Sequence, residues 1–134
     1  MLRRYFIPGV AVTKKNSQQM AFNQKTGRWF PVPSKAYKRF EKSAAVVLSA
    51  PGIPPIDYPV NVQCSYYFPL NKDGSDPKKK PDLANLLEAT DDILVKYGVI
   101  LDDNVDIVAT HDGSKVYYTN DCEPGTYIII ESLV

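Results

Sequence analysis

Two groups of acidic residues flank one predicted helix, and three lysines precede the first group. The first group begins at Asp82, and the second is the pair Asp102 and Asp103, which follows a glycine at position 98. Carboxylates gathered from two neighbouring elements repel one another, so proteins tolerate them mainly at the surface or around a hard cation. Lysines beside such a cation indicate that a phosphate is its further ligand. This pattern predicts phosphodiester hydrolysis assisted by Mg²⁺ or Mn²⁺.

The helix between the two acidic groups decides whether they can meet. Asp82 is a good N-cap, apolar residues recur at helical spacing as far as Tyr97, and Gly98 is a natural end. A helix of about 15 residues is about 22 Å long. Asp82 and Asp103 therefore come together only if the chain after the helix runs back alongside it.

The remaining periodicities predict one α+β domain that covers residues 1–134, with a mixed or antiparallel sheet and two main helices. The second helix is expected over 35–49, with Ser34 as its N-cap. Residues 111–114 are expected to form a hairpin turn between two strands. The expected strands cover residues 3–12, 60–68, 105–109, 115–119 and 127–130. Residues 13–27 are expected to form either a loop or a loose hairpin with residues 28–30.

Charge is divided unevenly along the chain. Residues 1–48 contain ten Lys and Arg residues and a single acid, a net charge of +9, whereas residues 49–134 contain six lysines and 14 acids, a net charge of −8. A basic half suits a polyanion, and an acidic half suits a cation. Nucleic acid together with a divalent metal satisfies both halves.

Candidate DNA contacts are basic or polar residues in predicted loops or on one helix face: Lys14, Lys15, Asn16, Lys35, Lys38, Arg39, Lys78, Lys79 and Lys80. The aromatic residues Trp29, Phe30 and Tyr37 are expected in the core. Cys64, which falls in an apolar strand pattern, is expected to be a buried thiol.

Several classes of protein are disfavoured. No apolar run approaches the ~18 residues of a membrane helix, and the first residues lack the apolar stretch of a secretion signal. We therefore expect no membrane association and a cytoplasmic location. The only histidine, His111, has no nucleophile motif to complete a catalytic triad. The seven glycines form no nucleotide-binding pattern.

The segment from Lys78 to Asp103 resembles the core motif of the RusA-type Holliday junction resolvases. The shared features are Pro-Asp-Leu-x-Asn-Leu, an acid seven residues after the Asn, and a later hydrophobic-Asp-Asp. A Lys-Lys-Asn-Ser sequence at 14–17 and a Ser-Lys-x-Tyr sequence at 34–37 extend the resemblance over roughly residues 7–116. It implies a small, homodimeric, Mg²⁺-dependent endonuclease of the kind common in phages and prophages. The expected cytoplasm is then that of a bacterium or a phage-infected host.

By position, the resemblance implies metal-ligating roles for Asp82, Asp92, Asp102 and Asp103, with Asp103 as the essential late acid. The family usually has a second Asp two residues after the first and a Lys six residues after it. This chain has Ala84 and Glu88 there. Three interpretations stay open. Glu88, one helical turn from position 84, replaces the missing acid; or Ala84 is a single inactivating substitution; or the protein binds junctions and cleaves them slowly or not at all.

The first function hypothesis is an endodeoxyribonuclease that cuts four-way junctions or other branched DNA during recombination and repair. Its catalytic residues would be Asp82, Asp103, Glu88 and Lys80, the lysine standing in for the one that the motif lacks. The alternatives are a DNA-junction binding protein without catalysis, and an interaction protein of divided charge with no nucleic acid partner.

Overall fold

A five-stranded mixed sheet forms the centre of the computed structural model, which describes residues 1–13 and 18–134. β7 lies between β1 and β4 and pairs antiparallel with both, whereas β5 and β6 pair parallel with the other edge of β4. The strands are β1 (Leu2–Pro8), β4 (Val60–Phe68), β5 (Val108–Thr110), β6 (Lys115–Tyr118) and β7 (Gly125–Ser132). The α+β prediction, with its mixed sheet, is confirmed.

Two helices begin where the sequence predicts. α1 (Lys35–Leu48) is capped by Ser34, whose hydroxyl accepts a hydrogen bond from the Tyr37 amide at 3.1 Å. α2 (Leu83–Lys96) is capped by Asp82, whose carboxylate accepts from the Asn85 amide at 3.2 Å. After α2 the chain reverses at Gly98, whose φ of +74° is a conformation that glycine adopts at little cost.

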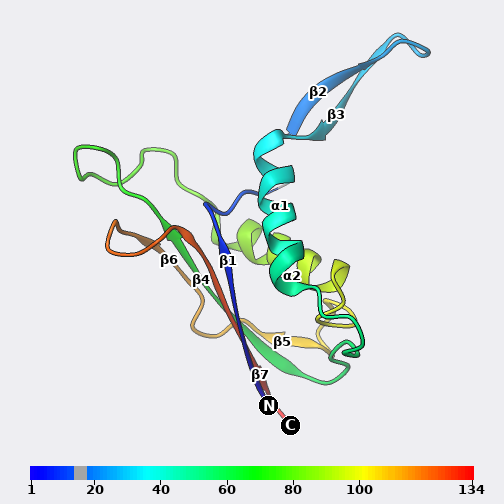
Figure 1. The fold of residues 1–134 in the computed structure, drawn as a ribbon, viewed down its shortest axis with the longest axis vertical. Coiled ribbons are helices and arrows are strands. Elements are labelled where there is room, and N and C mark those ends of the chain that lie inside the picture. Colours follow the sequence, from blue (N-terminus) through cyan, green and yellow to red (C-terminus); the bar gives the residue numbers. More distant parts are fainter. Residues whose placement is uncertain (14–17) are drawn as a thin grey trace.

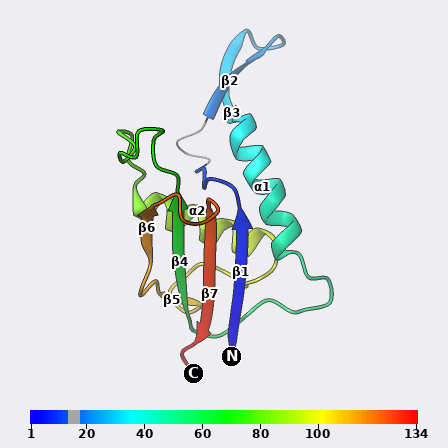
Figure 2. The same ribbon diagram turned by 60° about the vertical axis from the view of Figure 1, so that its left-hand side comes forward.

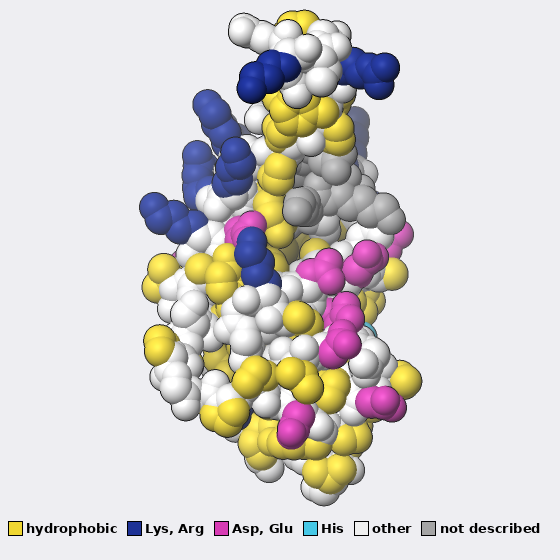
Figure 3. Space-filling view, turned by 90° about the vertical axis from the view of Figure 1, so that its right-hand side faces the viewer, with side chains coloured by type: hydrophobic (Ala, Val, Ile, Leu, Met, Phe, Trp, Pro, Cys, Tyr) yellow, Lys and Arg dark blue, Asp and Glu magenta, His cyan; other side chains and the backbone are white. Residues whose placement is uncertain are grey.

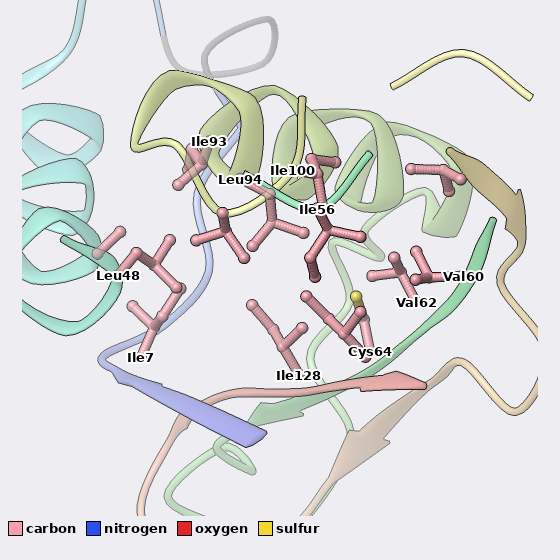
Figure 4. Close-up of a cluster of buried hydrophobic side chains, with 14 of the residues drawn as sticks. Ile7, Leu48, Ile56, Val60, Val62, Cys64, Ile93, Leu94, Ile100 and Ile128 are labelled. Carbon is pink, nitrogen blue, oxygen red and sulfur yellow. The ribbon is translucent and has the colours of Figure 1, made fainter. Parts of the chain in front are cut away.

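Both helices lie on one face of the sheet, and the core fills the space between the two layers (Figures 1 and 4). Alternate residues of β4, among them Val62 and Cys64, point into this core, and β7 contributes Ile128 and Ile130. α2 supplies Leu94, which is fully buried. The period-two pattern of β4 thus separates a buried face from a face turned away from the helices.

Three tyrosines pack together on the face of the sheet that is turned away from the helices. Tyr67 of β4 stacks on Tyr117 of β6 with ring centroids 4.9 Å apart, and Tyr127 of β7 meets Tyr67 edge-on at 5.6 Å. No described helix covers this face (Figure 2).

An ion pair ties the two helices together. Glu41, the only acid in the basic half of the sequence, lies on α1 and pairs with Lys96 of α2. Its carboxylate also accepts a hydrogen bond from the Tyr97 hydroxyl at 3.0 Å. These contacts set the end of α2 against α1.

The predicted hairpin around residues 111–114 is wrong. β5 and β6 follow one another along the same edge of β4 and do not pair with each other. Side chains bridge the gap in this ladder: Asn61 on β4 exchanges hydrogen bonds with the backbone of Asp112, and Ser114 accepts one from the Cys64 amide. Because β4 offers unpaired backbone groups along this edge, the chain continues beside it rather than reversing.

A two-stranded hairpin, β2 (Gln18–Asn23) and β3 (Arg28–Pro33), extends beyond the sheet (Figure 1). The loose hairpin in this region is confirmed, but the expectation that Trp29 and Phe30 lie in the core is wrong. Trp29 packs on Phe22 across the hairpin and is still 65% exposed. Tyr37, on α1, is buried as predicted.

The described residues contain no disulfide: Cys64 is a buried free thiol, as predicted, and Cys122 is an exposed one. Neither described helix has both the length and the apolar character that crossing a membrane requires.

Candidate active site

Asp82, the first predicted acid, lies exposed at the start of α2. Its capping hydrogen bond uses one carboxylate oxygen and holds the side chain beside the first turn of the helix. Helical rise places Asp82 about 15 Å along the axis from Asp92, close to three turns away. The two predicted helix acids therefore occupy opposite ends of α2.

An acidic cluster forms at the other end of α2, where the following loop returns. Asp103 of this loop interacts through its side chain with Asp92. Partial burial and the charges of Asp103 and Glu88 raise the pKa of the Asp92 carboxyl. The structure thus brings together three predicted site residues, Glu88, Asp92 and Asp103. Whether Asp82 joins them on a bound cation stays a prediction.

Asp91 and His111 form a pair that the sequence analysis did not assign. His111 Nε2 lies 2.9 Å from Asp91 Oδ2, and His111 Nδ1 lies 2.8 Å from the Val62 carbonyl oxygen. Burial raises the pKa of Asp91, and the hydrogen bond to Asp91 raises the pKa of His111. A signal for Asp91 was present in the sequence: helical spacing puts it on the apolar stripe, between Leu87 and Leu94.

The geometry of this pair requires a proton. Val62 offers only a carbonyl oxygen, so the imidazole nitrogen facing it must carry a hydrogen. The contact to Asp91 then needs a second proton, on either His111 Nε2 or the carboxyl group. The other Asp91 oxygen, Oδ1, is buried and has no hydrogen-bond partner among the described residues. Asp91 is thus an acid held beside the cluster at an energetic cost.

Asp102 is engaged in its own loop. One carboxylate oxygen accepts from the Asp103 amide at 2.7 Å, and the other accepts from the Asn104 side chain at 3.1 Å. This local turn presents Asp103 towards α2. The metal role predicted for Asp102 stays a prediction.

Basic residues gather over α1 and the hairpin, while acids lie lower on the same side of the molecule (Figure 3). Lys35, Lys38 and Arg39 are all exposed on α1, and Lys78, Lys79 and Lys80 are exposed just before α2. Lys14, Lys15 and Asn16 lie outside the described residues. On the face shown in Figure 3, the division of charge along the sequence is therefore also a division in space.

The donor chemistry of the acidic cluster fits Mg²⁺. Asp92 and Asp103 present hard oxygen donors, and a cation would relieve the repulsion that raises the pKa of Asp92. Among the residues that the structure describes, no three or more His, Cys, Asp and Glu side chains are arranged to hold a metal ion. Mg²⁺ does not require such a cage, because it usually binds one or two carboxylates and fills its other positions with water and substrate phosphates.

Comparison with known proteins places the chain in a family. No curated protein matches the sequence significantly. The family model described as endodeoxyribonuclease RusA matches residues 8–131, which include both helices and the strands β4, β5, β6 and nearly all of β7, but only the last residue of β1. The resemblance in the 78–103 segment is thereby confirmed over most of the chain, and with it the nuclease character of the family. The protein belongs to the RusA endodeoxyribonuclease family, whose members resolve Holliday junctions.

Proposed function

We propose that this protein is a Mg²⁺-dependent, structure-specific endodeoxyribonuclease that acts as a homodimer on four-way DNA junctions. The observation that supports this most is the approach of Asp103 to Asp92. Two carboxylates from different elements are held together although burial and the charge of Asp103 raise the pKa of Asp92. Such an arrangement is costly without a cation and useful with one.

Each group has a distinct role in the proposed reaction. Asp103, with Glu88 or Asp92, would hold one cation, and Asp82, at the other end of α2, would ligate a second. A cation, when bound, supplies Lewis-acid activation of water and of the phosphate. Lys80, in the loop before α2, would place its ammonium beside the phosphate and stabilise the charge that develops there. The basic face of α1 would hold the flanking DNA through its phosphates.

The symmetry of a four-way junction supports the proposed homodimer. A four-way junction has two equivalent strands to cut, and a two-fold dimer presents two sites in matching positions.

The test is incubation of the purified protein with a synthetic four-way junction, with and without Mg²⁺. Asp82→Asn and Asp103→Asn should each abolish Mg²⁺-dependent nicking and leave junction binding intact or tighter, because less negative charge then faces the phosphates. Asp106→Asn is a matched control, since Asp106 is an exposed acid in the same loop as Asp103. If both variants cut at the parental rate, the proposed site is wrong.

Glu88 decides how the chain replaces the acid absent at position 84. The two positions lie one turn apart on α2, and both are exposed. If Glu88 supplies the missing carboxylate, Glu88→Gln should reduce nicking as much as Asp82→Asn does. Ala84→Asp should then partly rescue Glu88→Gln across a Mg²⁺ titration. Full activity of Glu88→Gln at every Mg²⁺ concentration would remove Glu88 from the site.

A second candidate function is junction binding without catalysis. Ala84 favours it, because a methyl group there cannot ligate a cation. The same incubation separates the two functions: a binding protein retains the junction and does not nick it at any Mg²⁺ concentration.

A further inference from the structure

A cavity of about 690 Å³ opens where β4 and β6 end and α2 begins. Phe68, Tyr118 and Leu86 contribute apolar walls, and Lys79, Lys80 and Asp82 contribute charged groups. This volume lies within the range of cavities that enclose small ligands. The position is also the one where sheets with parallel strands bind ligands, beyond the carboxyl ends of the strands.

The aromatic wall follows from strand register. Phe68 of β4 pairs with Tyr118 of β6, so both side chains project from the same face of the sheet, with ring centroids 6.2 Å apart. Their neighbours Tyr67 and Tyr117 point to the opposite face, where they stack on each other. The adjacent residues Tyr117 and Tyr118 of β6 therefore project from opposite faces of the sheet, and only Tyr118 lines the cavity.

The loop that closes the cavity is anchored. The Leu70 amide donates to the Asn120 side chain at 3.1 Å, and the Asn71 side chain donates to the Asp76 carbonyl at 3.1 Å. These hydrogen bonds hold the loop in place as one wall of the cavity.

We propose that this cavity takes one unstacked nucleotide of branched DNA, with its base against Tyr118 and its phosphate at Lys79 and Lys80. The proposal rests on the proposed function and specifies how the site recognises its substrate. Aromatic rings stack on any nucleobase, and lysines pair with phosphates, so the combination matches a nucleotide better than an apolar peptide. Asp82 lines the same cavity, so the bound nucleotide would lie beside this proposed site residue.

A branched substrate supplies such a nucleotide at low cost. Bases at a branch point have an incomplete stack, so withdrawing one requires less free energy than in a continuous duplex. The cavity would therefore select branched DNA over duplex by the presence of a base that can enter it.

Lys80 lies over the ring on which the base would stack. Its ammonium lies 4.7 Å from the centroid of the Tyr118 ring, and its closest acid, Asp76, is 4.0 Å away. The Lys80 side chain is 51% exposed, and a cation over a ring at such a site is held weakly. An arriving phosphate would draw Lys80 away and free the ring face for stacking.

The test uses photo-crosslinking on the wild-type protein. Four-way junctions carry 5-iodouracil at single positions around the branch point, and complexes are irradiated in EDTA so that no strand is cut. We expect a cross-link at one position near the branch, mapped to Tyr118 or Phe68 by mass spectrometry, and none with the corresponding duplex. A cross-link only to Tyr117 or to the β2–β3 hairpin would overturn the proposal.

Affinity measurements give an independent result. Tyr118→Ala should weaken junction binding about tenfold and leave duplex binding unchanged, whereas Tyr118→Phe should bind as the parent does, because stacking needs the ring and not the hydroxyl. Tyr117→Ala is the matched control on the other face and should have no effect. Equal loss in both alanine variants would refute the assignment.

The experiments distinguish a failure of the nucleotide site from a failure of the nuclease function. A protein that nicks junctions with Mg²⁺ but gives no cross-link in the cavity keeps the nuclease function and loses this nucleotide site. A protein that does not bind junctions loses both.

Discussion

His111 should stabilise the fold through Asp91, and removing it should destabilise the protein by about 2 kcal/mol. His111→Leu keeps a similar volume and leaves neither Asp91 oxygen with a partner among the described residues. Breaking a fully buried ion pair in this way costs about 3–5 kcal/mol. We expect less here because the two side chains are 26% and 11% exposed, which lets water reach the pair.

The stabilisation should depend on pH. The hydrogen bond to Asp91 raises the pKa of His111 above its ordinary value, so the contribution is complete below the unfolded pKa of about 6.5. It is lost as the pH rises through the folded pKa, when one imidazole nitrogen faces an oxygen without a proton. Burial also raises the pKa of Asp91, which favours the protonated pair and acts in the same direction. The wild-type protein should therefore lose stability between about pH 6 and about pH 9.5.

The assay is urea unfolding in EDTA at both pH values for the wild type, His111→Leu, Asp91→Leu and the double variant. The double variant leaves no buried charge, so it should be more stable than the sum of the single effects predicts, with a coupling energy of about 2 kcal/mol at the lower pH. Asp91→Asn is the matched control. Its amide can donate to Nε2 of a neutral imidazole, so it should remove the pH dependence at a cost below about 1 kcal/mol. A coupling energy that is near zero, or unchanged between the two pH values, would refute this account of the pair.

Three further predictions follow from buried or exposed groups. Burial raises the pKa of the Cys64 thiol to about 12. A thiol reagent at neutral pH should therefore label only Cys122 in the native protein and both cysteines in denaturant. Rapid labelling of Cys64 in the native protein would contradict its buried position. Tyr66→Phe removes a buried hydrogen bond of 2.6 Å between the hydroxyls of Tyr66 and Thr90 on α2. The variant should have a free energy of unfolding about 1 kcal/mol lower in a urea titration. An unchanged free energy of unfolding would mean that this hydrogen bond makes no net contribution to stability. Changing Lys38 and Arg39 together to Ala should flatten the logarithmic salt dependence of DNA affinity by about two units in a binding titration, whereas an unchanged slope would place this face of α1 off the DNA.

Local signals in the sequence were enough to predict both helices and β4. Ser34 and Asp82 satisfy amides in the first turn of their own helix, and Gly98 reverses the chain directly after α2. Side chains of β4 alternate between the buried and the outer face, so the face of each residue follows from whether its position along the strand is odd or even. Each signal acts within a few residues, so sequence reading captures it, and the spacing of the 78–103 segment likewise identified the family.

Contacts between distant segments could not be obtained in this way. Asp91 is 20 residues from His111, and the return of Asp103 to Asp92 depends on how the loop after α2 packs. The exposure of Trp29 likewise depends on where the hairpin lies relative to the sheet. An aromatic residue, an acid and a histidine have the same local propensities in either setting. Only the packing of the sheet and helices determines whether they become core, surface or site.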